Sequence, residues 1–356
     1  MQPFAGRAAV AGIGMTALSR QSGRTELELA TEACRAACAD AGLVPREVDA
    51  VLSYHMNDSA PVVQVARALG IERLGWHNDI AGGGTQAASI LGDAAMLIHA
   101  GLARNILIYR ALNGRSGTRM NTASTGPQER HTYGLAGPIP LFALAATRYL
   151  HDTGLTAEHL HAVVAQSREN AKANPRALRR EPLGLADYLA RPYVCTPLRT
   201  VDCCQETDGA CALLVSGVLD GPRVRAVVRG GGPGCSSMDR APDVTAIFSA
   251  YVAPMLWEAS GMRPAQVDVA LPYDAYSWLV PRQLEDFGLV ERGELGAYLL
   301  ERRHAWVNPH GGLLSEGYVH GLNNVAQAVR ELRAGREVAL VTGFGGSYGS
   351  AALLVN

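Results

Sequence analysis

The chain has 356 residues, of which 48% are hydrophobic and 18% charged, with a formal net charge of −1. This length and apolar content suffice for two domains, or for one duplicated domain with a buried core. The near-neutral balance gives no electrostatic case for a nucleic acid or an anionic membrane as a partner.

The apolar runs are too short to span a bilayer, and the N-terminal residues lack the pattern of a signal peptide. Seven cysteines in such a chain predict reduced thiols in a cytoplasmic protein. Their spacing includes no repeated CxxC pairs, so no metal site is expected. The low charge and the 39 glycines favour an oligomer.

An internal duplication organises the chain. Residues 42–54 (GLVPREVDAVLSY) and 261–273 (GMRPAQVDVALPY) align without a gap. Each copy follows a helical pattern, over 27–41 and 252–260. Each then has a Gly where the helix stops, a turn that begins with Pro, and an apolar strand.

Two further similarities follow in the same order. Residues 76–84 (WHNDIAGGG) lead to a helix over 87–100, as residues 306–312 (WVNPHGG) lead to a helix over 322–332. Each half then has another strand, which begins at Asn105 or at Glu337. This alternation predicts a largely parallel sheet with helices on its faces. The expected fold is α/β, duplicated, with five layers α/β/α/β/α and halves at 1–220 and 221–356.

Residues 113–195, approximately, differ from both repeats. They carry Arg115, Arg119, Arg130 and His131, and helical patterns over 142–151 and 158–173. This composition predicts a loop or cap domain inserted into the first half. The first half then ends in a strand-like stretch over 201–218, in which Cys203 and Cys204 are expected to be small buried residues.

These motifs resemble the thiolase superfamily, in particular its lipid-transfer-protein (sterol-carrier-protein-type) branch. The similar segments are 198–210 (LRTVDCCQETDGA), 273–276 (YDAY), 283–288 (QLEDFG), 308–321 (NPHGGLLSEGYVHG) and 343–349 (GFGGSYG). The resemblance implies the duplicated thiolase fold. It also implies a nucleophilic Cys, a basic His and a second Cys, but those positions hold Ala81, Tyr318 and Gly343 here. Thiolysis through a covalent thioester is therefore not expected.

With tyrosine at both 273 and 318, the chain resembles the steroid side-chain aldol lyases of actinobacteria. Those enzymes cleave a β-hydroxyacyl-CoA by a retro-aldol reaction. That chemistry needs a base, an acid and donors for the thioester enolate, but no nucleophile. A phenol serves if neighbours lower its pKa from about 10. We expect Tyr273 and Tyr318 to converge, one as base and the other as acid, in an order that the sequence leaves open.

Glycine-rich turns would supply backbone N–H groups to the developing oxyanion. The expected supporting residues are Gly82, Gly83, Asn308, Gly311, Gly312, His320, Gly345 and Gly346. Several have an equally good structural interpretation: a Tyr at a strand end packs, a His is satisfied locally, an Asn holds a turn. Asp274 is expected to anchor its loop, and the basic run Arg176, Arg179 and Arg180 is either a solvated face or lies near CoA phosphates.

The resemblance implies a 17-hydroxy steroid with a three-carbon CoA side chain as substrate, and a 17-keto steroid and propionyl-CoA as products. CoA is then part of the substrate, and no other cofactor is implied. The implied assembly is a homodimer bound to a small OB-fold acyl-CoA-associated protein. The stretch between Arg229 and Trp257 is shorter than in the resembled group, which leaves a smaller or non-steroid acyl group open.

Other functions remain open. One is a catalytically inactive thiolase-like subunit that binds acyl-CoA or scaffolds a partner. Another is a C–C-forming enzyme of natural-product biosynthesis. A residual thiolase that uses Cys195 or Cys235 ranks last, because neither lies in a recognised motif.

Overall fold

The computed structural model describes residues 1–117, 128–135, 137–233 and 238–356. Arg119 and Cys235, named above, lie outside these described residues. Part of the short stretch between Arg229 and Trp257 lies outside them as well.

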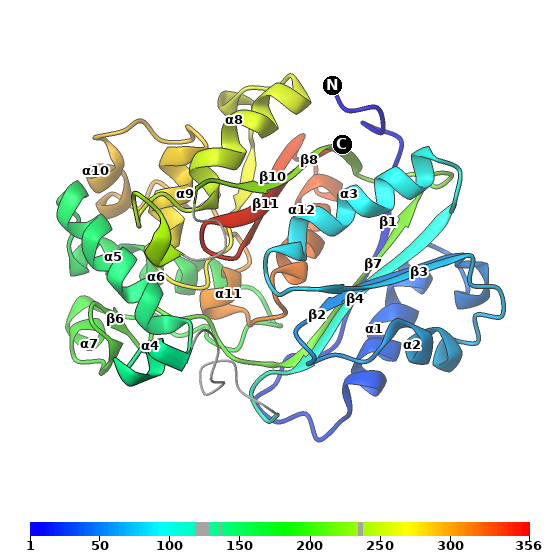
Figure 1. Ribbon diagram of the computed structural model, residues 1–356, viewed down its shortest axis with the longest axis horizontal. Coiled ribbons are helices and arrows are strands. Elements are labelled where there is room, and N and C mark those ends of the chain that lie inside the picture. Colours follow the sequence, from blue (N-terminus) through cyan, green and yellow to red (C-terminus); the bar gives the residue numbers. More distant parts are fainter. Residues whose placement is uncertain (118–127, 136, 234–237) are drawn as a thin grey trace.

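The described strands form a nine-stranded sheet and a two-stranded sheet (Figure 1). The order in the large sheet is β3-β2-β4-β7-β1-β8-β11-β10-β9, and β5 pairs with β6. The bounds are β1 Ala9–Met15, β2 Ala50–His55, β3 Trp76–Ala81, β4 Asn105–Asn113, β5 Tyr193–Cys195, β6 Leu198–Arg199, β7 Asp208–Ser216, β8 Arg223–Gly231, β9 Val269–Leu271, β10 Val338–Phe344 and β11 Tyr348–Val355.

The sheet is mixed, so the expectation of a largely parallel sheet is wrong. β2 runs parallel to β3 and β4, and β9 runs parallel to β10. The β4–β7, β7–β1, β8–β11 and β11–β10 pairs are antiparallel. The physical reason is plainest at β10 and β11, since the short turn between them permits only a hairpin.

The helices form layers around this sheet. α3 (Gln86–His99) and α12 (Leu322–Arg333) lie between the two halves and contact strands of both. α1 (Glu26–Asp40) and α2 (Val62–Leu69) cover the outer face of the first half, and α8 (Phe248–Ser260) covers that of the second. The predicted succession of helix and sheet layers is confirmed. One pairing, Ala9 with Arg223, joins the two halves into a single hydrogen-bonded sheet.

The duplication is visible residue by residue. Gly42 and Gly261 both end a helix with a positive φ, 71° and 68°, which favours glycine. A 3-10 turn follows each, Pro45–Glu47 and Pro264–Gln266, and then β2 or β9. The aspartates that precede these strands repeat the same hydrogen bonds. Asp49 accepts from the backbone at the start of β4, and Asp268 accepts from the backbone at the start of β10.

The inserted region packs on the second half. Its helices are α4 Gln128–Thr132, α5 Ile139–Thr153, α6 Ala157–Ala171 and α7 Leu185–Leu189. The remaining helices of the second half are α9 Leu279–Asp286, α10 Leu295–Leu300 and α11 Gly312–Ser315. The ring of Phe142 in α5 lies 5.2 Å from Tyr276 and 5.0 Å from Phe344 between centroids, which places α5 over the end of β10. The division at residue 220 stays a prediction.

The expectation of a strand through Cys203 and Cys204 is wrong, because β7 begins only at Asp208. The backbone of Cys203 bridges to Tyr276, and the N–H of Cys204 donates to the carbonyl of Ala275 at 2.8 Å. This segment therefore pairs with the loop after β9 and brings it against the first half. Among the helices of the described residues, none is long and apolar enough to cross a membrane.

Gly14 tests how closely α1 packs on β1. A Cβ at Gly14 would overlap the Ala33 carbonyl oxygen and the Ala37 nitrogen of α1. We therefore expect Gly14→Ala to lower the free energy of unfolding by about 3 kcal/mol, since a packed interface has no room for an extra methyl. Gly230→Ala is the matched control, because its Cβ would lie 3.8 Å from its nearest neighbour, the Met255 sulfur. Urea unfolding that gives equal losses for the two variants would contradict this packing account.

Candidate active site

A pocket of about 270 Å³ lies where the two halves and the inserted region meet. Its lining combines the turn 82–85 before α3, Tyr273, Ala275 and Tyr276 after β9, Tyr318 and His320 before α12, and Phe344 and Gly345 at the end of β10. Met56, Pro138, Phe142, Cys204, Glu206 and Tyr348 complete it. The predicted meeting of Tyr273, Tyr318 and the first glycine-rich turn is thus observed.

The two tyrosines touch through their hydroxyl groups. The Oη atoms of Tyr273 and Tyr318 lie 2.7 Å apart, and the ring planes are inclined at 82°. The backbone N–H of Tyr273 donates to Thr342 Oγ1 at 2.8 Å, and that of Tyr318 donates to Thr207 Oγ1 at 2.9 Å. Each tyrosine is therefore fixed by a threonine from a neighbouring strand or turn.

Two glycines make room for the Tyr273 ring. A Cβ at Gly84 would overlap the Tyr273 hydroxyl, and a Cβ at Gly321 would come within 2.8 Å of the ring. Gly321 also has a φ of 83°, which favours glycine. The glycine-rich turns thus allow close approach of a phenol, a role that the sequence analysis did not assign to Gly84 or Gly321.

The condition set above, that neighbours lower the phenol pKa, is not met. Burial raises the pKa of Tyr273 and of Tyr318 well above the ordinary value of a phenol. For Tyr318, the hydrogen bond from Tyr273 and the charge of Arg110 oppose burial without overcoming it. Both phenols are therefore neutral at physiological pH.

His320 lies beside the pair and is held from behind. Its ring packs edge-on against Tyr318 at 4.8 Å between centroids. Its Nδ1 faces the guanidinium of Arg110 at 2.9 Å, and its carbonyl accepts from the Tyr54 hydroxyl at 2.9 Å. Burial, and then the Arg110 charge, lower the pKa of His320 to about 3, so the imidazole is neutral.

Two of the expected oxyanion donors are already occupied. The N–H of Gly82 donates to the His55 carbonyl at 2.9 Å, and that of Gly345 donates to the Tyr348 carbonyl at 3.1 Å. Gly346 does not line the pocket. In the described part of the turn before α3, the N–H groups of Gly83 and Gly84 have no such partner. These two groups are the better candidates.

Asn308, Gly311 and Gly312 do not line the pocket, which corrects their expected place in an oxyanion site. The Asn308 amide donates to the Pro272 carbonyl at 3.0 Å, and a Cβ at Gly312 would overlap the Asp274 carboxylate. That carboxylate accepts from Leu313 N at 2.9 Å and caps α11, as expected of an anchor. These contacts hold the loop of Asp274, which also carries Tyr273. The polar groups of Asn308 and of the turn before α11 therefore face the protein interior and not the pocket.

Ala81, the vacated nucleophile position, is the exposed last residue of β3 and does not line the pocket. Of the described cysteines, Cys204 alone lines the pocket. Burial raises the pKa of the Cys204 thiol well above its ordinary value, which disfavours the thiolate that a thiolase requires. Cys195 lies in β5, outside the pocket.

Several lining or supporting residues were missed from sequence. Glu206 and Phe142 line the pocket, and Arg110 and Asp58 stand behind His320. A signal existed for Arg110, since it interrupts the apolar run of β4 (NILIYRALN) and a buried charge needs partners. No comparable local signal marks Asp58.

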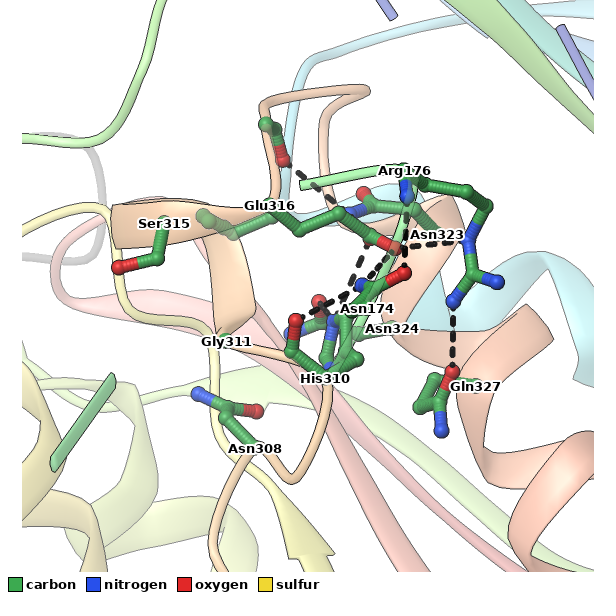
Figure 2. Close-up of polar contacts among 12 residues, drawn as sticks. Asn174, Arg176, Asn308, His310, Gly311, Ser315, Glu316, Asn323, Asn324 and Gln327 are labelled. Carbon is green, nitrogen blue, oxygen red and sulfur yellow. Dashed lines mark hydrogen bonds and ion pairs between the residues drawn. The ribbon is translucent and has the colours of Figure 1, made fainter. Parts of the chain in front are cut away.

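A buried polar cluster supports the turn that carries Tyr318 (Figure 2). The Glu316 carboxylate accepts from Arg176 Nε at 3.0 Å and from the amides of Asn174 and Asn323 at 2.9 Å each. Burial alone would raise the pKa of Glu316, but His310, Asn323 and Arg176 hold it below its ordinary value. Arg176, expected as part of a solvated run, is thus tied to the site.

Comparison with known proteins identifies the family of the chain. Residues 234–355 match the family model of the thiolase C-terminal domain-like group. The chain is 36% identical to a 17-hydroxy-3-oxo-4-pregnene-20-carboxyl-CoA lyase of Mycobacterium tuberculosis, over 95% of this chain and 96% of that protein. The chain belongs to the thiolase superfamily, in the branch of the steroid side-chain-cleaving aldolases.

Two further relatives of this thiolase-like chain support the assignment. It is 35% identical to a steroid side-chain-cleaving aldolase of Thermomonospora curvata, over 94% of this chain and 92% of that protein. The solved structure of an Ltp2-ChsH2(DUF35) aldolase superimposes with a TM-score of 0.91 at 33% identity, over 99% of both chains.

Glu316→Gln tests the cluster behind Tyr318. We expect the free energy of unfolding to fall by about 3 kcal/mol, because Arg176 is left without its carboxylate in a buried site. Glu169→Gln is the control, since Glu169 pairs with Lys172 at the surface at 3.5 Å. That variant should change stability by less than about 1 kcal/mol. Equal effects in thermal unfolding would show that the Glu316 cluster contributes no more than a surface pair.

Proposed function

We propose that the chain is a CoA-thioester aldol lyase that cleaves a β-hydroxyacyl-CoA to a ketone and propionyl-CoA. The observation that carries the proposal is the contact of two neutral phenols, 2.7 Å apart, inside a pocket formed by both halves. A retro-aldol cleavage removes a proton from one substrate atom and delivers a proton to another. A hydrogen-bonded pair of hydroxyls can do both, because one hydroxyl accepts a proton while the other donates one. The names of the two relatives support a steroid with a 17-hydroxyl group and a CoA side chain as substrate class.

A proton relay through the pair accounts for both steps. The β-hydroxyl of the substrate gives its proton to the oxygen of Tyr273, while the Tyr273 proton passes to Tyr318 along their hydrogen bond. The Tyr318 proton moves to the α-carbon as the Cα–Cβ bond breaks and the β-carbon becomes a carbonyl. Each phenol gains one proton and loses one, so neither has to exist as a phenolate, in keeping with the raised pKa values.

The roles of the two tyrosines in this relay follow the direction of the hydrogen bond between them. Tyr273 donates to Tyr318, which leaves the Tyr273 oxygen free to accept and the Tyr318 proton free to be given. Negative charge that develops on the thioester oxygen would be met by the N–H groups of Gly83 and Gly84. The proton balance closes without a redox cofactor or a metal ion, so we propose that none is used.

An arginine-lined cavity beside the pocket fits the phosphate groups of CoA. Arg20, Arg115 and Arg179 line about 300 Å³ of space that shares Cys204 and Glu206 with the pocket. Three arginines and one carboxylate line this space, and Arg115 pairs with that carboxylate, Glu206, at 3.6 Å. Burial, and then the charges of Arg20 and Arg191, lower the pKa of Arg179. Nearby Arg168 is buried, and its Nε has no hydrogen-bond partner among the described residues. A phosphate would satisfy such a cluster.

We further propose a homodimer that binds an OB-fold acyl-CoA-associated partner. β3 ends the large sheet, and its residues 76–78 are exposed, so one strand edge stands free to pair within the described fold. The aldolase of known structure is named for two components, Ltp2 and ChsH2(DUF35), which supports a heteromeric assembly for this chain.

The direct test is mass-spectrometric detection of acyl-CoA products from steroid and non-steroid β-hydroxyacyl-CoAs, with and without an OB-fold partner. We expect propionyl-CoA and a ketone, and we expect Tyr273→Phe and Tyr318→Phe each to lower kcat by about 10²–10⁴-fold. The double variant should be no slower than the slower single variant, because loss of either hydroxyl already interrupts the whole relay. Tyr251→Phe, in α8 outside the pocket, is the control. Multiplied losses would indicate an independent acid and base instead, and full activity of either single variant would exclude the relay.

The arginine cavity yields a separate prediction. Arg179→Ala should raise KM for the acyl-CoA roughly 10–100-fold with little change in kcat, since a charged hydrogen bond to phosphate is lost. Arg180→Ala, an exposed neighbour outside the cavity, should leave KM within about twofold. Steady-state kinetics that show the same KM for both variants would place the phosphates elsewhere.

A further inference from the structure

Arg110 is a buried charge on a strand that is otherwise apolar. Its side chain has no solvent exposure, and it lies in β4 within the run NILIYRALN. It makes an ion pair with Asp58 at 2.6 Å and donates to the Ala111 carbonyl at 2.7 Å. Its remaining polar contacts, from Nε at 3.2 Å and from a terminal nitrogen at 2.9 Å, both reach Nδ1 of His320, and its guanidinium lies 5.7 Å from the centroid of the Tyr54 ring.

Donor chemistry fixes the state of the imidazole. A guanidinium carries only donors and keeps its proton, so the atom that it faces has to accept. Nδ1 of His320 therefore holds a lone pair, and the ring proton of the neutral imidazole resides on Nε2. The ring can be neither the Nδ1–H tautomer nor an imidazolium while this contact is made, because both would place two protons face to face.

Asp58 keeps this arrangement electrically neutral. Burial alone would raise the pKa of Asp58, but the charge of Arg110 holds it below its ordinary value, so the carboxylate is ionised. The carboxylate also accepts from the Met56 N–H at 2.8 Å, which ties it to a residue of the pocket wall. The guanidinium of Arg110 thus faces His320, while the carboxylate of Asp58 neutralises its charge.

The other edge of the ring belongs to the pocket. His320 is one of the lining residues, and its Nε2 has no hydrogen-bond partner among the residues that the structure describes. A Cβ at Gly83 would lie 3.5 Å from His320 Cε1, so the ring stands next to the turn whose N–H groups are candidates for the oxyanion site. Tyr54 fixes the His320 backbone, which has a φ of 46°.

We propose that Arg110 and Asp58 are positioning residues that lock His320 as a neutral, Nε2-protonated donor to the thioester oxygen of the substrate. The inference rests on the proposed function for the identity of the acceptor. A neutral imidazole is suited to this task, since it stabilises the enolate oxygen by hydrogen bonding without protonating it. It adds a donor from the second half to those of Gly83 and Gly84 from the first.

A pair of isosteric variants tests the donor. The amide nitrogen of Gln reaches the position of Nε2, and that of Asn reaches the position of Nδ1. We expect His320→Gln to keep kcat within about tenfold of the unchanged protein, and His320→Asn to lower it by about 10²–10³-fold, the loss expected when one oxyanion donor is removed. KM should change little in either. Equal losses in the two variants of the assembled enzyme would overturn the donor role.

The tautomer is read independently by NMR of the protein with ¹⁵N-labelled histidine. The His320 signals are assigned by their disappearance in His320→Gln. The proposal requires one protonated nitrogen, Nε2, and one unprotonated nitrogen, Nδ1, at neutral pH. Arg110→Met should allow the Nδ1–H tautomer of His320 and lower kcat. Arg110→Lys, which restores a donor, should recover part of the Nε2–H population and part of kcat.

These two measurements separate the possible failures. An Nδ1–H or doubly protonated His320 in the unchanged protein would overturn the lock whatever the reaction is. An Nε2–H ring in a protein that cleaves no β-hydroxyacyl-CoA would leave the lock in place and overturn the proposed function. If Arg110→Met fails to fold, the tautomer of the unchanged protein and the Gln–Asn comparison still decide the matter.

Discussion

The hydrogen bond between Tyr273 and Tyr318 depends on the close packing of three turns. The Tyr273 ring fits only because Gly84 and Gly321 have no side chains, and Tyr318 reaches it from a turn held by Thr207. Each turn comes from a different part of the duplicated fold. A phenol pair that is enclosed in this way stays neutral, since burial disfavours a phenolate and the charge of Arg110 near Tyr318 does not offset that cost. The chemistry that the site supports therefore has to move protons between neutral groups.

Buried charges behind the pocket are paired and serve its geometry. Arg110 and Asp58 compensate each other behind His320, and Glu316 and Arg176 do so behind the turn of Tyr318. Unpaired charges at these depths would cost several kcal/mol each. The arginines around Arg179 differ, because three of them line one adjoining cavity with a single carboxylate, Glu206, which pairs with Arg115. Paired charges orient the reacting groups, and the unbalanced ones suit a phosphorylated substrate.

The sequence predicted what depends on local pattern and on duplication. The helix stops at Gly42 and Gly261 and the turns that follow them recur because a similar pattern of Gly, Pro and apolar residues repeats 219 residues apart. The meeting of Tyr273 and Tyr318 was predicted from the family resemblance. The roles of Asn308 and Gly312 were not, since a motif gives spacing but not which side of a turn faces the cavity. The raised pKa of the two phenols could not be predicted either, because burial is a property of the assembled layers. Arg110 and His320 are 210 residues apart, and no local pattern pairs them.

The pH dependence of kcat distinguishes a neutral relay through the phenol pair from a phenolate base. In the assembled enzyme, with an OB-fold partner supplied, a neutral relay predicts a kcat for β-hydroxyacyl-CoA cleavage that is level between about pH 7 and 9, because both phenols stay protonated throughout this range. A kcat that rises about tenfold for each pH unit over the same range would mean that a phenolate is the reactive base. That result would contradict the relay.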